Sequence, residues 1–237
     1  MHPRAPNPRI AGMRHSKREF IPAAGVDWLL PLYDPVVRLL GRDALLRRTL
    51  IADADIEPGQ HLLDIGCGTG ILSVLLKQVE PDANVRGLDP DPKALARARA
   101  RADRAGAAVE FDRGFADQLP YTDASFDRVF SSLMFHHLTP DQKLATLRSV
   151  HRVLRPGGFL HLLDFGEARR GSHGLVAHLF HRGEEIREQL EGRIPSLMRA
   201  GGFADVEEVS RHRTTFGSIS YYRAHRAAGD ESASTPG

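Results

Sequence analysis

The sequence predicts an α/β fold in which a mostly parallel sheet carries helices on both faces. After residue 61, short apolar runs of strand length alternate with longer helical segments, as is typical of βαβ units. A length of 237 residues fits one domain of ordinary α/β size with a large core. Near the other end, strand-like runs at residues 204–215 and 218–226 flank Phe216-Gly217, which indicates a hairpin that closes the edge of the sheet.

Helix signals separate the first strands. We expect these strands at residues 61–65, 84–89, 108–113, 126–131 and 159–164. Asp91 is placed to cap a helix that has Pro92 in its first turn and that ends at Gly106. Thr139 and Gln142 form a capping-box start for a helix that runs to about residue 154.

Glycine and proline residues mark the ends of the remaining predicted elements. Pro156-Gly157-Gly158 stops the helix before the fifth strand. Residues 174–182 and 184–200 are expected to form two helices, and Gly201-Gly202 ends the second of them. Before the sheet, the pattern of residues 28–50 predicts a helical segment interrupted by prolines. This segment would pack over a ligand as a lid or simply against the core.

The composition of the chain indicates how it divides into segments and which kinds of partner it does not require. We expect a disordered basic tail at 1–20, a helical lid at 21–55, the α/β domain at 56–228 and a flexible tail at 229–237. The net charge of +2 does not indicate nucleic acid as an obligatory partner. No apolar signal-peptide core follows Met1, and no stretch reaches membrane-span length. The single cysteine allows no internal disulfide, which favours the cytoplasm.

A basic stripe runs along the helix that follows Asp91. Its members are Arg97, Arg99, Arg101 and Arg104. Such a stripe can bind nucleic acid, but the alanines between the arginines predict a solvated face with the small side chains turned inward.

The run from Leu62 to Gly70 is the most informative segment. Its pattern predicts a buried strand that contains an acid, Asp64. A glycine turn follows this strand and precedes an apolar helix at residues 71–79. A strand, a glycine turn and a helix N-terminus let a small ligand lie against bare backbone. Ile71 takes the place of the third glycine of a dinucleotide fingerprint, and no phosphate-loop Gly-Lys-Ser/Thr follows. Asp64 would repel a phosphate but accept hydrogen bonds from an amine.

Residues 63–70, Leu-Asp-Ile-Gly-Cys-Gly-Thr-Gly, resemble the first motif of class I S-adenosylmethionine-dependent methyltransferases. The resemblance covers about residues 33–226. Leu119-Pro120-Tyr121, Ser125-Phe126-Asp127 and Arg155-Pro156-Gly157-Gly158 match later family segments. The pattern as a whole is most similar to the ubiquinone/menaquinone C-methyltransferase-like group. It implies a Rossmann-like, doubly wound sheet of seven strands with an antiparallel last strand and an N-terminal helical lid.

The resemblance also implies how S-adenosylmethionine is bound. Asp89, 25 residues after Asp64, would bind the ribose hydroxyls. The amino-acid end would meet the glycine turn, with its carboxylate toward the helix N-terminus. Phe115 stands where the family often has an acid for the adenine, so Phe115 is expected to flank the ring while Ala116 or Asp117 bonds its amino group. The full set of expected cofactor residues is Tyr33, Asp64, Gly66, Cys67, Gly68, Asp89, Pro90, Phe115, Ala116 and Ser131.

Methyl transfer needs mostly alignment and a dry site, but an acidic acceptor also needs a base. His136 and His137 follow the fourth strand, and either could act as base or be structural. The expected substrate is a small, partly apolar molecule such as a quinone, lipid or secondary metabolite. Candidate residues for its pocket are Phe135, Leu175, Leu179 and Phe180.

Other functions are weaker. His178, His181 and Glu185 could grip a metal, but a polar helix face is the better interpretation, and no metal is expected. Enzymes that methylate the amino groups of bases carry Asn/Asp-Pro-Pro-aromatic after the fourth strand, whereas residues 132–135 contain no proline. Cytosine-C5 enzymes need a catalytic cysteine away from the glycine turn, whereas the only cysteine here is Cys67. A non-catalytic S-adenosylmethionine-binding protein and an NAD-dependent oxidoreductase remain as alternatives.

Overall fold

A computed structural model describes residues 43–165, 194–214 and 217–229. Its strands are β1 (His61–Ile65), β2 (Asn84–Asp89), β3 (Val109–Arg113), β4 (Phe126–Ser132), β5 (Leu154–Phe165), β6 (Ala204–Thr214) and β7 (Gly217–His225). Its α-helices are α2 (Asp43–Ala52), α3 (Ile71–Val79), α4 (Pro92–Ala105), α5 (Pro140–Val153) and α8 (Ile194–Ala200). Short 3₁₀ helices lie at Ala116–Gln118 and Phe135–His137.

The strands form one seven-stranded sheet in the order β3-β2-β1-β4-β5-β7-β6. Strands β1 to β5 are parallel, and β7 runs antiparallel to both of its neighbours. The predicted fold class, including the antiparallel last strand, is therefore confirmed. The chain runs outward from β1 to β3 and then returns to place β4 on the other side of β1, so the strand order reverses between β1 and β4. Ligands of open parallel sheets bind at such a reversal, outside the carboxyl ends of the strands.

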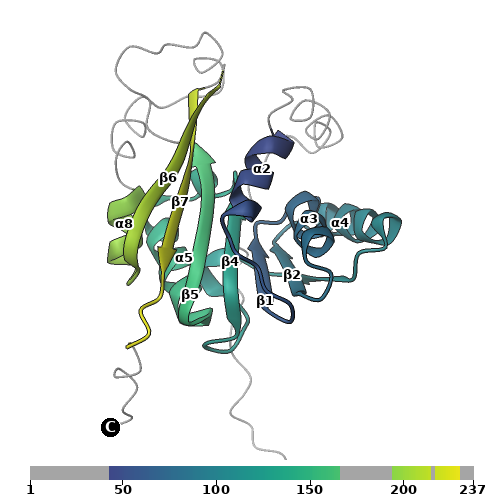
Figure 1. The fold of residues 1–237 in the computed structure, drawn as a ribbon, viewed down its shortest axis with the longest axis horizontal. Coiled ribbons are helices and arrows are strands. Elements are labelled where there is room, and N and C mark those ends of the chain that lie inside the picture. Colours follow the sequence, from purple (N-terminus) through teal and green to yellow (C-terminus); the bar gives the residue numbers. More distant parts are fainter. Residues whose placement is uncertain (1–42, 166–193, 215–216, 230–237) are drawn as a thin grey trace, which may run out of the picture.

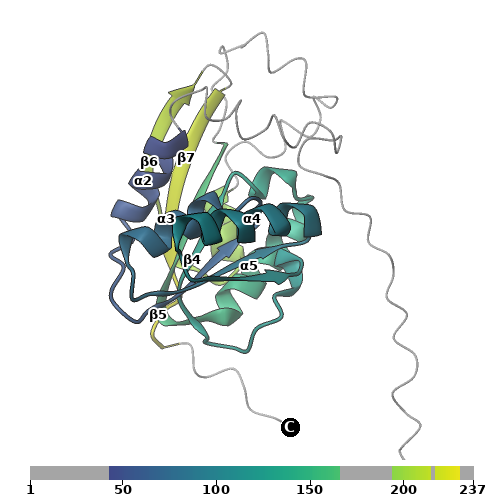
Figure 2. The same ribbon diagram turned by 90° about the vertical axis from the view of Figure 1, so that its right-hand side faces the viewer.

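Helices cover both faces of the sheet (Figures 1 and 2). On one face α2 and α3 pack on a core that includes Leu62, Phe130 and Tyr221, and α4 packs beside α3 over Phe111. On the other face α5 and α8 cover a core around Leu63 and Leu162, among others. Burial on both faces explains why the central strand β1 is mostly apolar, whereas the edge strand β3 is partly exposed and carries charged residues. The carboxyl ends of β1, β4 and β5 point toward the top of Figure 1.

The helix caps form as predicted. Asp91 Oδ1 accepts the Lys93 N–H at 2.8 Å, and Gly106 ends α4 in the left-handed conformation. Thr139 and Gln142 form both bonds of a capping box at the start of α5.

The start of β5 differs from its prediction. We expected residues 156–158 to be a loop, but β5 begins at Leu154, which pairs with Phe126. The register then shifts before Arg128, so the Pro-Gly-Gly run forms an irregularity inside the strand rather than a separate turn. The Gly157 N–H donates to the Arg226 carbonyl at 2.7 Å, which ties this irregularity to the end of the chain's last strand.

Candidate active site

The chain leaves β1 through a turn with three left-handed glycines. Their φ angles are +65° at Gly66, +53° at Gly68 and +74° at Gly70. A Cβ at Gly66 would lie 2.8 Å from Met134 Cβ, and one at Gly70 would lie 2.9 Å from Ala98 Cβ. Among the described residues, a Cβ at Gly68 would have no neighbour within 4 Å. The turn is therefore tightly packed at its ends and open at Gly68, where a ligand can approach the main chain.

The backbone donors of this turn are engaged within the protein. The N–H groups of Gly66 and Cys67 both donate to the Leu88 carbonyl, at 2.8 and 3.0 Å. The Gly68 N–H donates to Asp89 Oδ2 at 2.9 Å. A ligand at the open side does not find these three donors free, so the turn is better suited to an ammonium group than to a carboxylate. Binding of the cofactor's amino-acid end here stays a prediction.

Asp64 lies beneath the turn, with 1% of its surface exposed. Its carboxylate accepts the Ser73 hydroxyl at 2.6 Å and the Ser73 amide of the first turn of α3. Burial raises the pKa of Asp64 to about 7, and the Asp89 carboxylate also raises it. The positive end of α3 thus already faces a carboxyl group, and a cation bound nearby would favour its ionised form.

Asp89 ends β2 and binds two backbone amides with its two carboxylate oxygens. Oδ1 accepts the Asp91 N–H at 2.9 Å, and Oδ2 accepts the Gly68 N–H at 2.9 Å. Burial raises the pKa of Asp89, although both amide bonds lower it. Each carboxylate oxygen can accept a second hydrogen bond. Asp89 is therefore held in place with capacity left for two ligand hydroxyls.

The tip of β4 carries buried polar atoms. Ser131 is fully buried, and within the described part of the chain neither its Oγ nor that of Ser132 has a hydrogen-bond partner. Leu133 follows in the left-handed region at φ +56°, which is strained for a branched side chain. Buried hydroxyls without partners are rare in folded proteins, so their position beside the glycine turn fits a site built for a polar ligand.

The expected adenine contacts follow β3. Phe115 has 38% of its surface exposed and precedes the 3₁₀ helix that Ala116 begins. Pro90 lies after β2, and its carbonyl accepts the Arg113 Nε–H at 3.2 Å. An exposed aromatic ring at this edge is available to flank a base, but its contact with adenine stays a prediction.

His136 forms a dyad with an acid that sequence reasoning missed. His136 Nδ1 lies 2.8 Å from Asp164 Oδ1, and the His136 amide donates to Asp164 Oδ2 at 3.2 Å. The Phe165 amide also donates to Oδ1, at 2.7 Å. Asp164 is 1% exposed, whereas His136 remains 31% exposed. A usable signal was present, because Asp164 closes the apolar run of β5 as Asp64 and Asp89 do in β1 and β2.

The two neighbours of His136 have other surroundings. The His137 ring lies 4.0 Å from that of His136, and burial lowers the pKa of His137 to about 4, with a smaller effect from His136. Phe135, a candidate pocket residue, is instead 1% exposed and belongs to the core beneath α5. His136 is thus the one of these three residues that combines exposure with a carboxylate partner.

Several predicted residues lie outside the described part of the chain. These are Tyr33, Leu175, Leu179 and Phe180, the possible metal ligands His178, His181 and Glu185, and most of the lid. Among the described residues, no group of three or more His, Cys, Asp or Glu side chains is arranged to hold a metal ion. The lone Cys67 is buried in the core of α3 and α4, and burial raises its thiol pKa.

Comparison with known proteins gives the family. Residues 62–158 match a methyltransferase domain model. The chain is 36% identical over 154 residues to demethylmenaquinone methyltransferase of Thermus thermophilus, covering 64% of this chain and 69% of that protein. It is 36% identical over 131 residues to a ubiquinone/menaquinone biosynthesis C-methyltransferase of Xanthomonas campestris, covering 54% and 51%. A solved S-adenosylmethionine-dependent methyltransferase of Aquifex aeolicus shares the fold, with a TM-score of 0.62, 18% identity and coverage of 83% and 96%.

The fold, the glycine turn and these relatives place the chain among the class I S-adenosylmethionine-dependent methyltransferases. Within that class it belongs to the ubiquinone/menaquinone C-methyltransferase-like group. The predicted family, enzyme class and cofactor are confirmed at this level. The chain spans about two thirds or less of the length of the curated relatives it matches.

The residues at the site fit the family's cofactor. Open main chain at Gly68, a carboxylate at the end of β2 and unpartnered hydroxyls at the end of β4 converge at the reversal of strand order.

In the described residues, no helix has the length and apolar character needed to cross a membrane.

Proposed function

We propose that this protein transfers a methyl group from S-adenosylmethionine to a small, partly apolar acceptor, and that His136 removes a proton from that acceptor. The hydrogen bond of 2.8 Å between His136 Nδ1 and Asp164 Oδ1 is the observation that carries the proposal. A carboxylate only accepts, so this bond places the ring proton on Nδ1 and leaves the lone pair on Nε2. Nε2 can then act as a general base on this partly exposed side chain.

Asp164 is well suited to orient the ring. Its carboxylate accepts two backbone amides besides the imidazole, so it cannot turn away from His136. It also stabilises the imidazolium that forms when Nε2 takes the proton. His137 supports this assignment indirectly, since burial keeps it neutral and its pKa of about 4 makes it a weak base.

When bound, S-adenosylmethionine supplies an electrophilic methyl group on a sulfonium that is already a good leaving group. The protein then has two tasks, to align the acceptor and to take its proton. As the new bond from the acceptor oxygen or carbon to the methyl group forms, the acceptor proton moves to His136 Nε2 and the electron pair of the broken bond stays on sulfur. An acceptor with a phenolic hydroxyl or an activated carbon fits this chemistry.

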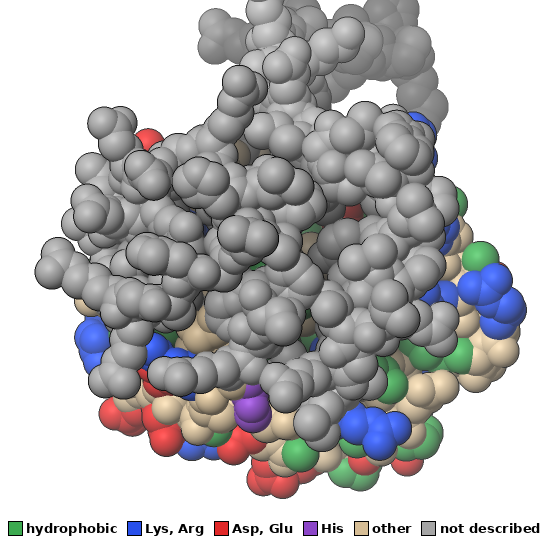
Figure 3. Space-filling view, turned by 90° about the horizontal axis from the view of Figure 1, so that it is seen from above, with side chains coloured by type: hydrophobic (Ala, Val, Ile, Leu, Met, Phe, Trp, Pro, Cys, Tyr) green, Lys and Arg blue, Asp and Glu red, His purple; other side chains and the backbone are tan. Residues whose placement is uncertain are grey.

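The surroundings support a small molecule rather than a polyanion. Along the rim of the face shown in Figure 3, the described residues include both basic and acidic side chains. A nucleic-acid surface would gather basic groups on one side. We further propose a cytoplasmic location, because the only cysteine is a buried free thiol.

The test uses the full chain and a panel of phenols, hydroquinones and carbon acids, with methyl transfer followed as formation of S-adenosylhomocysteine. We expect His136→Ala to lower kcat by about 10²- to 10⁴-fold, the range for removal of a general base. Asp164→Asn should lower it by about tenfold or more, because the ring loses its carboxylate partner.

His137→Ala is the matched control and should change kcat by less than about threefold, since its pKa of about 4 makes it a weak base. Cofactor affinity, measured with S-adenosylhomocysteine, should be unchanged in all three variants. Full activity of the His136→Ala enzyme would disprove the base, whereas cofactor binding without transfer to any acceptor would favour a non-catalytic binding protein.

A further inference from the structure

A side chain of α4 holds the glycine turn. Arg101 Nη1 donates to Thr69 Oγ1 at 2.7 Å and also to the Thr69 carbonyl oxygen. Arg101 is half-buried, whereas Arg97 and Arg104 on the same helix are exposed. The predicted solvated stripe is therefore wrong at Arg101, which contacts the turn between β1 and α3.

Close packing brings this guanidinium within reach. Ala98 is fully buried, and a Cβ at Gly70 would lie only 2.9 Å from its Cβ, so α4 and the turn have no room for larger side chains. Arg101 follows Ala98 by three residues and therefore lies on the same side of the helix. The small residues at positions 70 and 98 thus place Arg101 beside Thr69.

The contact restricts a segment that is flexible by composition. Thr69 lies between Gly68 and Gly70, whose φ angles of +53° and +74° are open to glycine but strained for other residues. Asp89 holds this segment on one side through the Gly68 amide, and Arg101 holds it on the other through Thr69. Bonds from a guanidinium are stronger than those between neutral groups. The turn is therefore kept in one conformation before a ligand arrives.

We propose that Arg101 is a positioning residue for S-adenosylmethionine, acting through Thr69 to hold the open main chain at Gly68 in the conformation that receives the cofactor. The role follows from preorganisation, because a turn that is already ordered loses less conformational freedom on binding. Arg101 itself need not touch the cofactor.

The test is calorimetric titration of the full chain with S-adenosylhomocysteine, which requires no methyl acceptor and is therefore independent of the role proposed for His136. We expect Arg101→Met to weaken binding by about tenfold or more, the size of one lost charge-assisted bond. Arg101→Lys keeps a cationic donor and should recover part of the loss. Arg104→Met, on the exposed side of the same helix, is the matched control and should bind within about twofold of the parent.

Kinetics add a second measurement once an acceptor is known. The KM for S-adenosylmethionine should rise in Arg101→Met, while kcat at saturating cofactor should stay within about threefold, because the reacting groups are untouched.

Binding by Arg101→Met at the parent's affinity would overturn the proposal, and so would an Arg101→Lys variant that folds but binds no better than Arg101→Met. If Arg101→Met fails to fold, Thr69→Val carries the test through loss of the hydroxyl partner. We expect a smaller loss of about threefold there, and unchanged binding by Thr69→Val and Arg101→Lys together would reject the role.

Discussion

Asp89 holds two segments of the fold together, and we predict that it also binds the cofactor. Its two oxygens accept amides from the glycine turn and from the start of α4, which fixes two segments around the end of β2. The remaining lone pairs point to the family role of binding ribose hydroxyls. The sequence spacing from Asp64 predicted the second role, while the amide bonds to Gly68 and Asp91 appear only in the structure.

We predict that Asp89→Ala loses affinity for S-adenosylhomocysteine by about 100-fold, because two hydroxyl-to-carboxylate bonds vanish at about 1.5 kcal/mol each. The same change should lower the free energy of unfolding by about 1 to 2 kcal/mol, since two backbone amides lose their acceptor. Titration calorimetry and urea unfolding measure the two effects.

Asp91→Ala separates these effects, because the Asp91 side chain caps α4 through the Lys93 amide. It should cost about 1 kcal/mol of stability and leave affinity within about twofold. Equal affinity of Asp89→Ala and the parent would remove Asp89 from the cofactor site.

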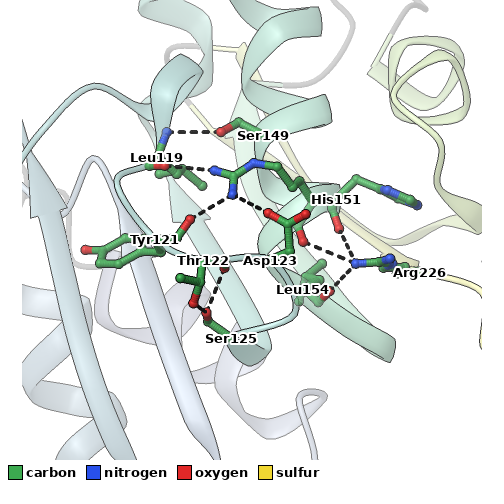
Figure 4. A network of polar contacts seen from close by, with 10 residues as sticks. Leu119, Tyr121, Thr122, Asp123, Ser125, Ser149, His151, Leu154 and Arg226 are labelled. Atoms are coloured by element: carbon green, nitrogen blue, oxygen red, sulfur yellow. Dashed lines mark hydrogen bonds and ion pairs between the residues drawn. The ribbon is translucent and has the colours of Figure 1, made fainter. Parts of the chain in front are cut away.

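At the scale of elements, α5 holds the connection that leads from the Ala116–Gln118 helix into β4. Arg152 in its last turn donates to the carbonyls of Tyr121 and Leu119 at 2.7 and 2.8 Å, and to Asp123 at 2.7 Å (Figure 4). The Leu119 amide in turn donates to Ser149 Oγ at 3.0 Å. The loop after the Ala116–Gln118 helix is thus anchored on α5, in addition to the bonds between its own Thr122 and Ser125.

Arg152→Met should lower the free energy of unfolding by about 2 kcal/mol, because two loop carbonyls lose a charged donor. The exposed ion pair with Asp123 adds little to that figure. Arg148→Met, on the exposed face of α5, is the control and should stay within about 0.5 kcal/mol. Equal unfolding midpoints for the two variants in urea would show that the loop does not depend on Arg152.

At the scale of the whole molecule, a series of hydrogen-bonded polar side chains crosses the face of the sheet that α2 covers. His161 in β5 lies 2.7 Å from the Tyr221 hydroxyl of β7, which donates to Asp53 after α2 at 2.6 Å. His161 is 1% exposed, and its ring stacks on Phe130 of β4. Burial, together with the smaller effects of the Arg128 and Arg223 charges, lowers the pKa of His161 to about 3.

This depressed pKa makes stability depend on pH. His161 stays neutral in the folded state, while in the unfolded chain it takes up a proton below about pH 6.5. Its contribution is therefore fully present above pH 6.5 and is lost as the pH falls toward 3, by up to about 1.4 kcal/mol per pH unit.

We predict that His161→Phe, which keeps a ring beside Phe130, loses less stability than the parent between pH 6.5 and 4. Urea unfolding at each pH measures the difference. Asp64, whose pKa is raised to about 7, acts in the opposite direction and favours the folded state at low pH. Its contribution to the pH dependence of stability is the same in the two proteins and therefore cancels in their comparison. Parallel stability curves for variant and parent would contradict a neutral buried His161.

The sequence by itself determined the strands apart from the start of β5, together with the glycine turn, the caps of α4 and α5 and the family. These features depend on residues close together in the chain, whose periodicity and conformational preferences are readable without a structure. Tertiary structure alone decided which distant side chains meet: His136 with Asp164, Arg101 with Thr69, and His161 with Tyr221. Those contacts depend on the order of strands in the sheet and on how closely helices pack against it, and both arise from burial of the whole apolar surface rather than from any local pattern.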